Sequence, residues 1–182
     1  SLKLIRNVRE QLGAFVGSHP NNLVGVINAT TGLNIVARSL PLQEGDEILT
    51  TDHEYGALEK TWTFIARKTG AKYIHADVPL PLASAAEFTE AIWSKITPKT
   101  KVLFLSHLTS ATALTFPIEE LIQRAKENGI WTVIDGAHAP GHVPLQLDEL
   151  DADFYSGNCH KWMLTPKGSA FLHVHPQVQH LI

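Results

Sequence analysis

Short apolar runs alternate with longer amphipathic segments along most of this chain, and this alternation limits its fold more than any other feature. Runs of strand length occur at 23–27, 46–51, 71–75, 101–106 and 130–135. Helical patterns lie before and between them, at 3–15, 56–68, 85–96 and 118–128, with another helix after the first run. Repeated strand–helix–strand units predict a mainly parallel sheet with helices on both faces, which is a three-layer α/β/α fold.

The elements become shorter after Leu145. Two strand-like segments, 154–156 and 170–174, are separated from their neighbours by Gly and Pro, and we expect no helix there. Because such short connections suit antiparallel pairing, the sheet is expected to be mixed, with antiparallel strands near one edge.

Three residues mark expected helix ends. Thr30 or Thr31 can cap the helix that follows the first strand, because a hydroxyl oxygen can accept a bond from a first-turn N–H. Pro117 suits the first turn of its helix and Gly129 its end.

Composition excludes several classes of protein. The chain has 182 residues, 44% of them hydrophobic, and a net charge of −3, which favours one folded soluble domain. Its basic residues are scattered, so nucleic acid is not expected as a partner. No apolar run approaches the roughly 20 residues that cross a bilayer. Cys159 is the only cysteine, which excludes an internal disulfide framework, and a cytoplasmic location is expected.

Chemically capable side chains follow most of the apolar runs. Ligands of parallel sheets collect at the carboxyl ends of the strands, so we expect these side chains to meet there. The set comprises Thr30, Thr31, His53, Tyr55, 106–110, Asp135, His138, His160 and Lys161.

Three of these positions have both a chemical and a purely structural interpretation. A helix start at Thr31 could hold a phosphate, or the threonine could simply cap the helix. Asp135 follows a buried run and needs a cationic partner, such as a protonated pyridine nitrogen, unless it only forms a turn before Gly136. Lys161 lies between His160 and Trp162, surroundings that can lower its pKa and activate it, although isolated lysines are usually solvated.

A zinc-dependent hydrolase is the alternative from a different class. Asp135, His138, His142 and His160 could be imagined as zinc ligands. Pro140 and Gly141 argue against a continuous helix between the first two histidines, and this reading gives Lys161 no role.

Two motifs together resemble the class V aminotransferase family, which consists of fold type I enzymes that use pyridoxal 5'-phosphate (PLP). They are 135–138 (DGAH) and 156–162 (SGNCHKW), and the similarity extends from about Leu23 to Leu172, including 106–110 (SHLTS). The closest branches are the isopenicillin N epimerase-like and cysteine desulfurase-like enzymes.

The resemblance implies a role for each candidate residue. Lys161 would form the Schiff base with PLP and move the α-proton, and Asp135 would pair with the pyridine nitrogen. Tyr55 would stack on the ring, with His53 as the second candidate. Ala137 would lie beneath the ring and His138 near its hydroxyl. The phosphate would be held by Thr30, Thr31, Asn158 and His160. Ser110 stands where many relatives have Asn, and its shorter side chain leaves a gap that a water could bridge.

The resemblance also implies an activity and an assembly. The expected chemistry is epimerisation, C–S or C–N lysis, desulfuration or transamination of an amino acid through a Cα carbanion. Residues 1–182 would form the PLP-binding large domain of a homodimeric enzyme, without the N-terminal segment and the C-terminal small domain of relatives. An inactive fragment that keeps the fold is the remaining alternative.

Overall fold

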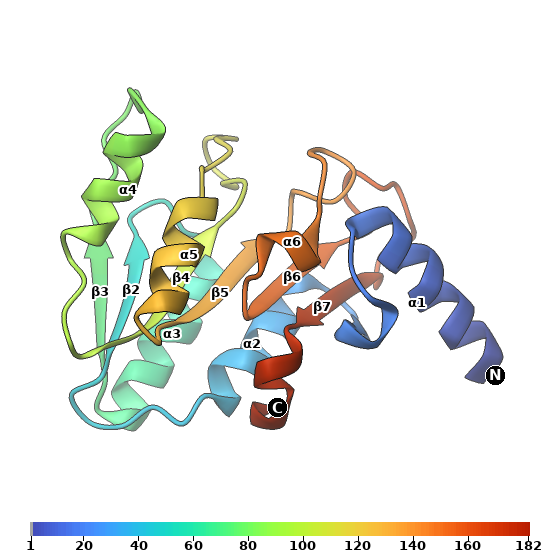
Figure 1. Cartoon of the computed structure of the whole chain (residues 1–182), viewed down its shortest axis with the longest axis horizontal. Helices are drawn as coiled ribbons and strands as arrows, with labels where there is room; N and C mark the ends of the chain where they lie inside the picture. Colours follow the sequence, from blue (N-terminus) through green and yellow to red (C-terminus); the bar gives the residue numbers. More distant parts are fainter. Residues whose placement is uncertain (1) are drawn as a thin grey trace.

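One mixed sheet forms the centre of the protein in a computed structural model that describes residues 2–182 (Figure 1). Its strands lie in the order β1-β7-β6-β5-β4-β2-β3. In chain order they are β1 (Leu23–Val26), β2 (Glu47–Thr51), β3 (Lys72–Ala76), β4 (Thr100–Ser106), β5 (Trp131–Gly136), β6 (Phe154–Asn158) and β7 (Ala170–Val174).

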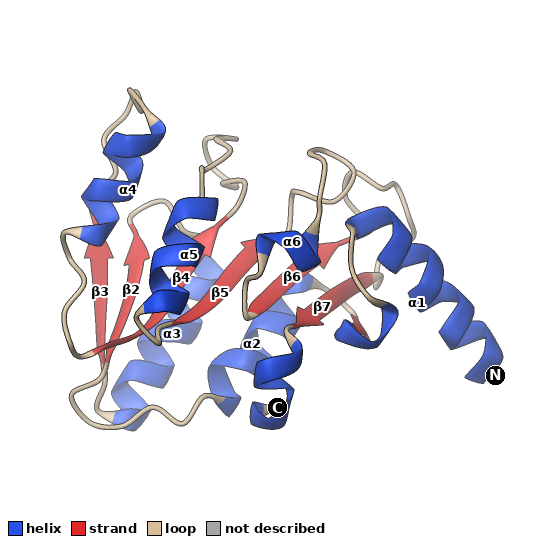
Figure 2. Ribbon diagram, viewed as in Figure 1, coloured by secondary structure: helices blue, strands red, loops and turns tan. Residues whose placement is uncertain are grey.

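Helices cover both faces of this sheet, as predicted (Figure 2). Helices α2 and α3 pack on one face, and α4, α5 and α6 lie over the other. The helices are α1 (Leu2–Val16), α2 (Ala29–Ser39), α3 (Gly56–Thr69), α4 (Ala85–Trp93), α5 (Glu119–Glu127) and α6 (Leu147–Leu150), with 3-10 turns at Pro20–Asn22 and Pro176–Leu181.

Two hydrophobic cores lie on opposite faces of the sheet, and β4 shows why. Its side chains alternate between them: Leu103 and Leu105 pack with α4 and α5, whereas Val102 and Phe104 pack with α2 and α3. All four are fully buried. A strand buried on both faces has a continuous apolar sequence, which is the pattern seen at 101–106.

Strand direction gathers six carboxyl ends at one edge of the sheet. The pairs β2–β3, β2–β4, β4–β5 and β5–β6 are parallel. Strand β7 is antiparallel to both β6 and β1, so β1 runs in the same direction as β6. The expectation of antiparallel pairing near one edge is therefore confirmed, and the chain leaves β1, β2, β3, β4, β5 and β6 on the same side.

The prediction that Thr30 or Thr31 caps α2 was wrong. The cap is Asn28, whose side-chain oxygen accepts from the Thr31 N–H at 2.8 Å. Both threonines lie inside the first turn, so their hydroxyls are not used by the cap. A Cβ added at Gly32 on this helix would lie 2.4 Å from the Ser156 hydroxyl oxygen. The absence of a side chain at Gly32 therefore lets α2 approach β6 closely.

The prediction of no helix after Leu145 was also wrong, because α6 lies between β5 and β6. A four-residue helix is too short to show a 3.6-residue period, and its Leu147 and Leu150 simply join the α5-side core. Pro117 precedes the first helical turn rather than forming it, because α5 begins at Glu119 after its cap, Ile118.

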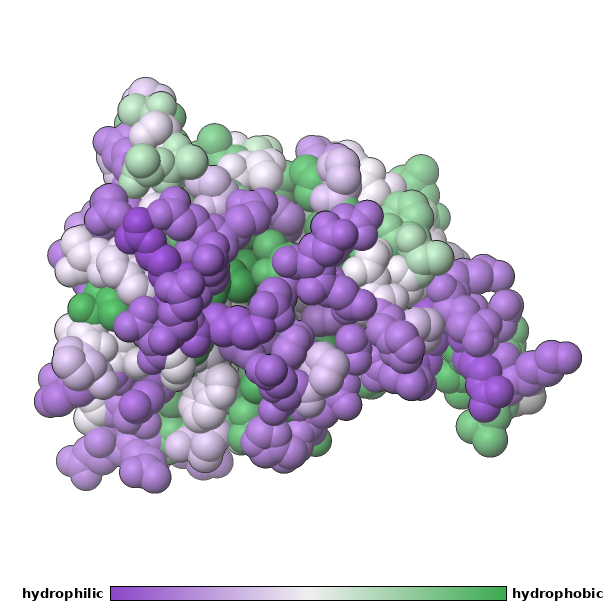
Figure 3. Space-filling view, in the orientation of Figure 1, coloured by the Kyte–Doolittle hydropathy of each residue, from purple (hydrophilic) through white to green (hydrophobic). Residues whose placement is uncertain are grey.

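Helix α1 stands apart from the two helical layers. Only Gly13 and Val16 of this helix are buried. At the right of Figure 3 its surface is mainly hydrophilic with smaller apolar areas, and the α5–α6 face is also largely hydrophilic. None of the helices in the described part of the chain is long and apolar enough to cross a membrane.

Candidate functional site

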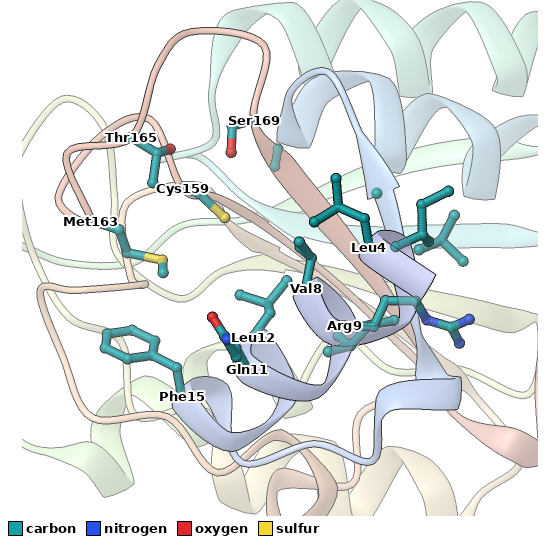
Figure 4. A pocket seen from close by; sticks show the side chains of 15 residues that line it. Leu4, Val8, Arg9, Gln11, Leu12, Phe15, Cys159, Met163, Thr165 and Ser169 are labelled. Carbon is teal, nitrogen blue, oxygen red and sulfur yellow. The ribbon is translucent and has the colours of Figure 1, made fainter. Parts of the chain in front are cut away.

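Two cavities lie on either side of the segment that follows β6. The larger, which we call the apolar groove, has a volume of about 820 Å³ and lies between α1 and the β1–β7 edge (Figure 4). It is lined by Leu4, Ile5, Val8, Arg9, Gln11, Leu12, Phe15, Leu23, Val24, Gly25, Cys159, Met163, Thr165, Ser169 and Ala170. Apart from Arg9, this lining carries no charged side chain.

The smaller, which we call the strand-end cavity, has a volume of about 440 Å³ and lies at the carboxyl edge of the sheet. Every strand whose carboxyl end reaches this edge, except the outer β3, contributes through the residues that follow it. The lining is Asn28, Thr30, Thr31, Tyr55, Ala57, Ser106, Leu108, Ser110, Asp135, Ala137, His138, Asn158, His160 and Lys161. All predicted site residues are brought together here, except His53.

Asp135 is a buried carboxylate in the wall of this cavity. It lies near the end of β5, is 4% exposed, and accepts one bond at 2.9 Å from the Ala137 N–H. Burial raises its pKa to about 6, opposed by that bond and by the positive charge of Lys161. Gly136 permits this packing because a Cβ there would meet the ring of Tyr155. The carboxylate is thus held in place with capacity for a further hydrogen-bond donor.

Lys161 follows β6, and its amine is held by a histidine. The Nζ atom lies 2.7 Å from Nε2 of His138, which follows β5. Burial lowers the pKa of Lys161, although the charge of Asp135 opposes this shift. Burial and the neighbouring Lys161 also lower the pKa of His138, so the neutral imidazole can accept the bond from the amine. The geometry gives an oriented lysine that loses its proton more readily than an exposed one.

The start of α2 provides unused donors to the cavity. Its Ala29 N–H is bound by the Asn158 side-chain oxygen at 2.8 Å, and the Thr31 N–H by Asn28. Within residues 2–182, the Thr30 N–H and the hydroxyls of Thr30 and Thr31 have no hydrogen-bond partner. Free donors at a positive helix end suit a phosphate group.

Tyr55 and His53 point to different environments, although they are two residues apart. Tyr55 is the cap residue of α3, lines the cavity and is 46% exposed. His53 lies outside the cavity, where its Nε2 donates to the Val78 carbonyl at 3.0 Å and its ring packs edge-on against Phe116. The structure therefore does not bring His53 to the site, and Tyr55 is the aromatic ring available there.

The cavity also contains residues that the sequence had not singled out. These are Asn28 and Ala57, whereas Ser106 and Leu108 belong to the predicted segment 106–110. Asn28 was visible as a polar residue after an apolar run. Glu54 lies directly behind Ser106 and also follows an apolar run, but its contact with Ser106 depends on which strands are neighbours.

The zinc alternative is not supported. No three His, Cys, Asp or Glu residues of the described chain cluster in a way that could hold a metal ion. His142 packs edge-on against Trp162, and His160 donates from Nδ1 to the Ser169 carbonyl at 3.0 Å.

The donor set of the strand-end cavity fits PLP. An anion site at the start of α2, a buried carboxylate that needs a donor, and a lysine of lowered pKa match the phosphate, pyridine nitrogen and aldehyde of this cofactor. The methyl side chain of Ala137 and the ring of Tyr55 in the same lining suit an aromatic ring.

Known proteins resemble this chain over nearly its whole length. Isopenicillin N epimerase of Streptomyces clavuligerus is 40% identical over 173 residues, which cover 95% of this chain and 44% of that protein. A probable cysteine desulfurase of Vibrio cholerae serotype O1 is 36% identical and covers 91% of this chain and 41% of its own length. The chain thus spans less than half the length of these relatives.

The solved structures agree with the sequence relatives. A variant of C-DES with glycine covalently linked to its PLP cofactor has a TM-score of 0.90 at 29% identity, over 100% of this chain and 48% of that one. The profile of the family Aminotransferase class-V matches residues 1–182. The chain therefore belongs to the class V aminotransferase family, whose enzymes depend on PLP.

Proposed function

We propose that this chain is the PLP-binding part of an enzyme that acts on an amino acid at its α-carbon or β-carbon. The observation that carries the proposal is the convergence of Lys161, Asp135 and the start of α2 in one cavity at the carboxyl edge of the sheet. The reaction class is epimerisation, C–S or C–N lysis, desulfuration or transamination.

Each group of cavity residues has a task in holding the cofactor. Thr30 and Thr31, with Asn158 and His160, hold the phosphate. Asp135 holds a proton at the pyridine nitrogen. The remaining wall residues, Tyr55, Ala137, His138 and Ser110, enclose the ring. When bound, PLP withdraws electrons from the substrate and so weakens the bonds at its α-carbon.

Lys161 both binds the cofactor and moves the substrate proton. Its amine is positioned by His138 at 2.7 Å, and its lowered pKa increases the fraction of free amine near neutral pH. As a free amine, Lys161 would hold PLP through the aldehyde of the cofactor, with loss of water. Once displaced by the amine of the substrate, it would take or return the proton at the α-carbon. His138 keeps the amine directed into the cavity during both tasks.

The proposed domain is the whole of residues 1–182, since all cavity residues come from one sheet and its adjoining loops. We further propose a cytoplasmic homodimer. Exposed apolar side chains support an assembly, because Trp162 is 49% and Leu164 86% exposed directly after Lys161. Light scattering of the purified protein measures the oligomeric state.

Borohydride trapping tests the proposed function. The protein is incubated with PLP, reduced, digested and mapped by mass spectrometry, with Lys161→Ala as the matched control. We expect the label on Lys161 in the unmodified protein and its loss in the variant. A label elsewhere, or none on the protein in its native length, would contradict the proposal and favour an inactive protein with this fold.

A further inference from the structure

Glu54 lies just behind the strand-end cavity and binds two neighbouring strands. Its Oε1 accepts from the Thr51 hydroxyl at 2.8 Å and from the Ser106 N–H at 3.2 Å. Its Oε2 accepts from the Ser106 hydroxyl at 2.5 Å. Three donors from the ends of β2 and β4 thus converge on one carboxyl group.

Strand β5, on the other side of β4, makes the Glu54–Ser106 contact relevant to the site. Ser106 lines the cavity, and its Cα is paired in register with that of Asp135 on β5. A side chain that fixes Ser106 therefore acts one strand away from the carboxylate proposed to bind the pyridine nitrogen.

The contacts of Glu54 also influence Tyr55, whose ring lines the strand-end cavity. Tyr55 follows Glu54 directly, and its carbonyl accepts the first bonds of α3, from Leu58 N–H at 2.8 Å and Glu59 N–H at 3.1 Å. The Tyr55 side chain makes no capping bond. Its position therefore depends on the backbone at the start of α3, which Glu54 ties to the sheet.

The surroundings of Glu54 raise the pKa of its carboxyl group, so that a substantial fraction is protonated near neutral pH. Burial raises its pKa to about 7, although the bonds from Ser106 and Thr51 lower it. The ionisable groups that face it are Asp135 and Tyr73, both of which would be repelled by its negative charge when they are ionised. Within the described chain, no Lys or Arg forms an ion pair with it. Near neutral pH it can therefore also donate a hydrogen bond.

We propose that Glu54 is a positioning residue of the cofactor site: it clamps the ends of β2 and β4 and thereby holds Ser106 and Tyr55 in the cavity wall. The inference rests on the proposed function for its effect on PLP, but the clamp itself exists without the cofactor.

The test compares Glu54→Ala and Glu54→Gln in the protein at its native length, with Glu59→Gln as control. Glu59 lies on α3 and bonds only Tyr73 and His75, away from the cavity. We expect Glu54→Ala to weaken PLP binding by about tenfold, because three hydrogen bonds are lost. Glu54→Gln keeps an acceptor for Ser106 and should bind PLP within about threefold of the unmodified protein.

A spectroscopic readout separates positioning from general stability. The absorbance of bound PLP is followed from pH 5 to 9. In the unmodified protein we expect an inflection near pH 7, where Glu54 ionises next to Asp135, and its loss in Glu54→Gln. Unchanged PLP affinity together with an unchanged absorbance profile in Glu54→Ala would overturn the proposal.

Amide exchange distinguishes this proposal from the proposed function. In the cofactor-free state, the Ser106 N–H should exchange more quickly in Glu54→Ala than in the unmodified protein. Its exchange rate should be unchanged in Glu59→Gln. If the unmodified protein takes up no PLP, the proposed function fails, while this exchange still measures the clamp. If Glu54→Ala does not fold, Ser106→Ala removes one of the three bonds, and unchanged PLP affinity and spectrum in that variant would overturn the inference.

Discussion

The two cavities differ in the ionisable side chains that line them, although the segment 158–165 contributes to both. Asn158, His160 and Lys161 face the strand-end cavity, whereas Cys159 and Thr165 face the apolar groove. The groove is the larger, at about 820 Å³ against about 440 Å³. Size and apolar lining alone would therefore select the groove rather than the proposed cofactor site.

Convergence of the strand ends distinguishes the smaller cavity. It receives residues from five strands, including a buried carboxylate and an amine of lowered pKa, whereas the groove lies along one sheet edge and one projecting helix. Burial opposes the charged form of an ionisable group, and the strand-end cavity has three lining groups with shifted pKa values, Asp135, His138 and Lys161. Burial also raises the pKa of Cys159 in the groove, but no ionisable group of shifted pKa faces it across the groove in the described lining. The following substitutions test this contrast.

Replacement of Lys161 should give the largest effect. Lys161→Ala removes the proposed cofactor bond and the proton acceptor together, so kcat should fall by at least about 10,000-fold. The exposed Lys167 of the same segment provides the control, and Lys167→Ala should keep full activity. Steady-state kinetics on amino acid substrates, with circular dichroism to check folding, measures both. Activity within tenfold of the unmodified protein would remove Lys161 from the mechanism.

Asp135→Asn should change activity and stability in opposite directions. Loss of the carboxylate removes the partner of the pyridine nitrogen, and kcat should fall by about 100-fold. Burial raises the pKa of Asp135 from 3.8 to about 6, so its stabilising contribution is complete below pH 3.8 and is lost as the pH rises through 6. Above pH 6, Asn should therefore stabilise the cofactor-free protein.

The size of this stabilisation is bounded by the shift. One pKa unit corresponds to about 1.4 kcal/mol, so the gain in unfolding free energy is at most about 3 kcal/mol. Urea unfolding of the cofactor-free protein at pH 5 and pH 8 measures it. A loss of stability at pH 8 would show that the Asp135 charge is already compensated.

Thr30→Val tests the phosphate end of the cavity. The Thr30 hydroxyl has no partner in the described chain and lies at the start of α2. A hydrogen bond to a charged phosphate contributes about 1.5 kcal/mol or more, so PLP affinity should fall by about tenfold with little change in kcat at saturation. Fluorescence titration with PLP measures the affinity. Unchanged affinity would place the phosphate elsewhere.

Local sequence patterns were sufficient to predict several of the residues that meet in the cavity, whereas Ala137 and Asn158 were assigned through the family resemblance. The apolar run before Asp135 defines a strand, and its last residues must lie at the carboxyl edge of a parallel sheet. The same argument applies to Lys161 after 154–158 and to Thr31 after 23–26. Each depends only on the end of one strand, so the neighbours of that strand need not be known.

Other features depend on contacts between distant segments, which local patterns do not contain. Glu54 binds Ser106 only because β2 and β4 are neighbours, an order that the sequence does not reveal. No local pattern distinguishes His53 from Tyr55, and the preference for Tyr55 came from the family resemblance. The turn after β2 directs the His53 ring to Phe116 and the Tyr55 side chain to the cavity. The cap at Asn28 required knowledge of where α2 begins.

Thr165→Val should give the smallest effect and completes the contrast with Thr30→Val. The Thr165 hydroxyl borders the apolar groove and is buried without a hydrogen-bond partner among residues 2–182. A buried hydroxyl without a partner costs about 1 kcal/mol or more, so the nearly isosteric Val should raise the unfolding free energy by about 1 kcal/mol. This corresponds to roughly 2–4 °C in Tm for a protein of this size.

PLP affinity of Thr165→Val should stay unchanged, because no residue proposed to bind the cofactor lies in the groove. Calorimetry and PLP titration of the two Thr→Val variants measure both properties. If Thr165→Val weakened PLP binding as much as Thr30→Val, the two cavities would not be functionally distinct.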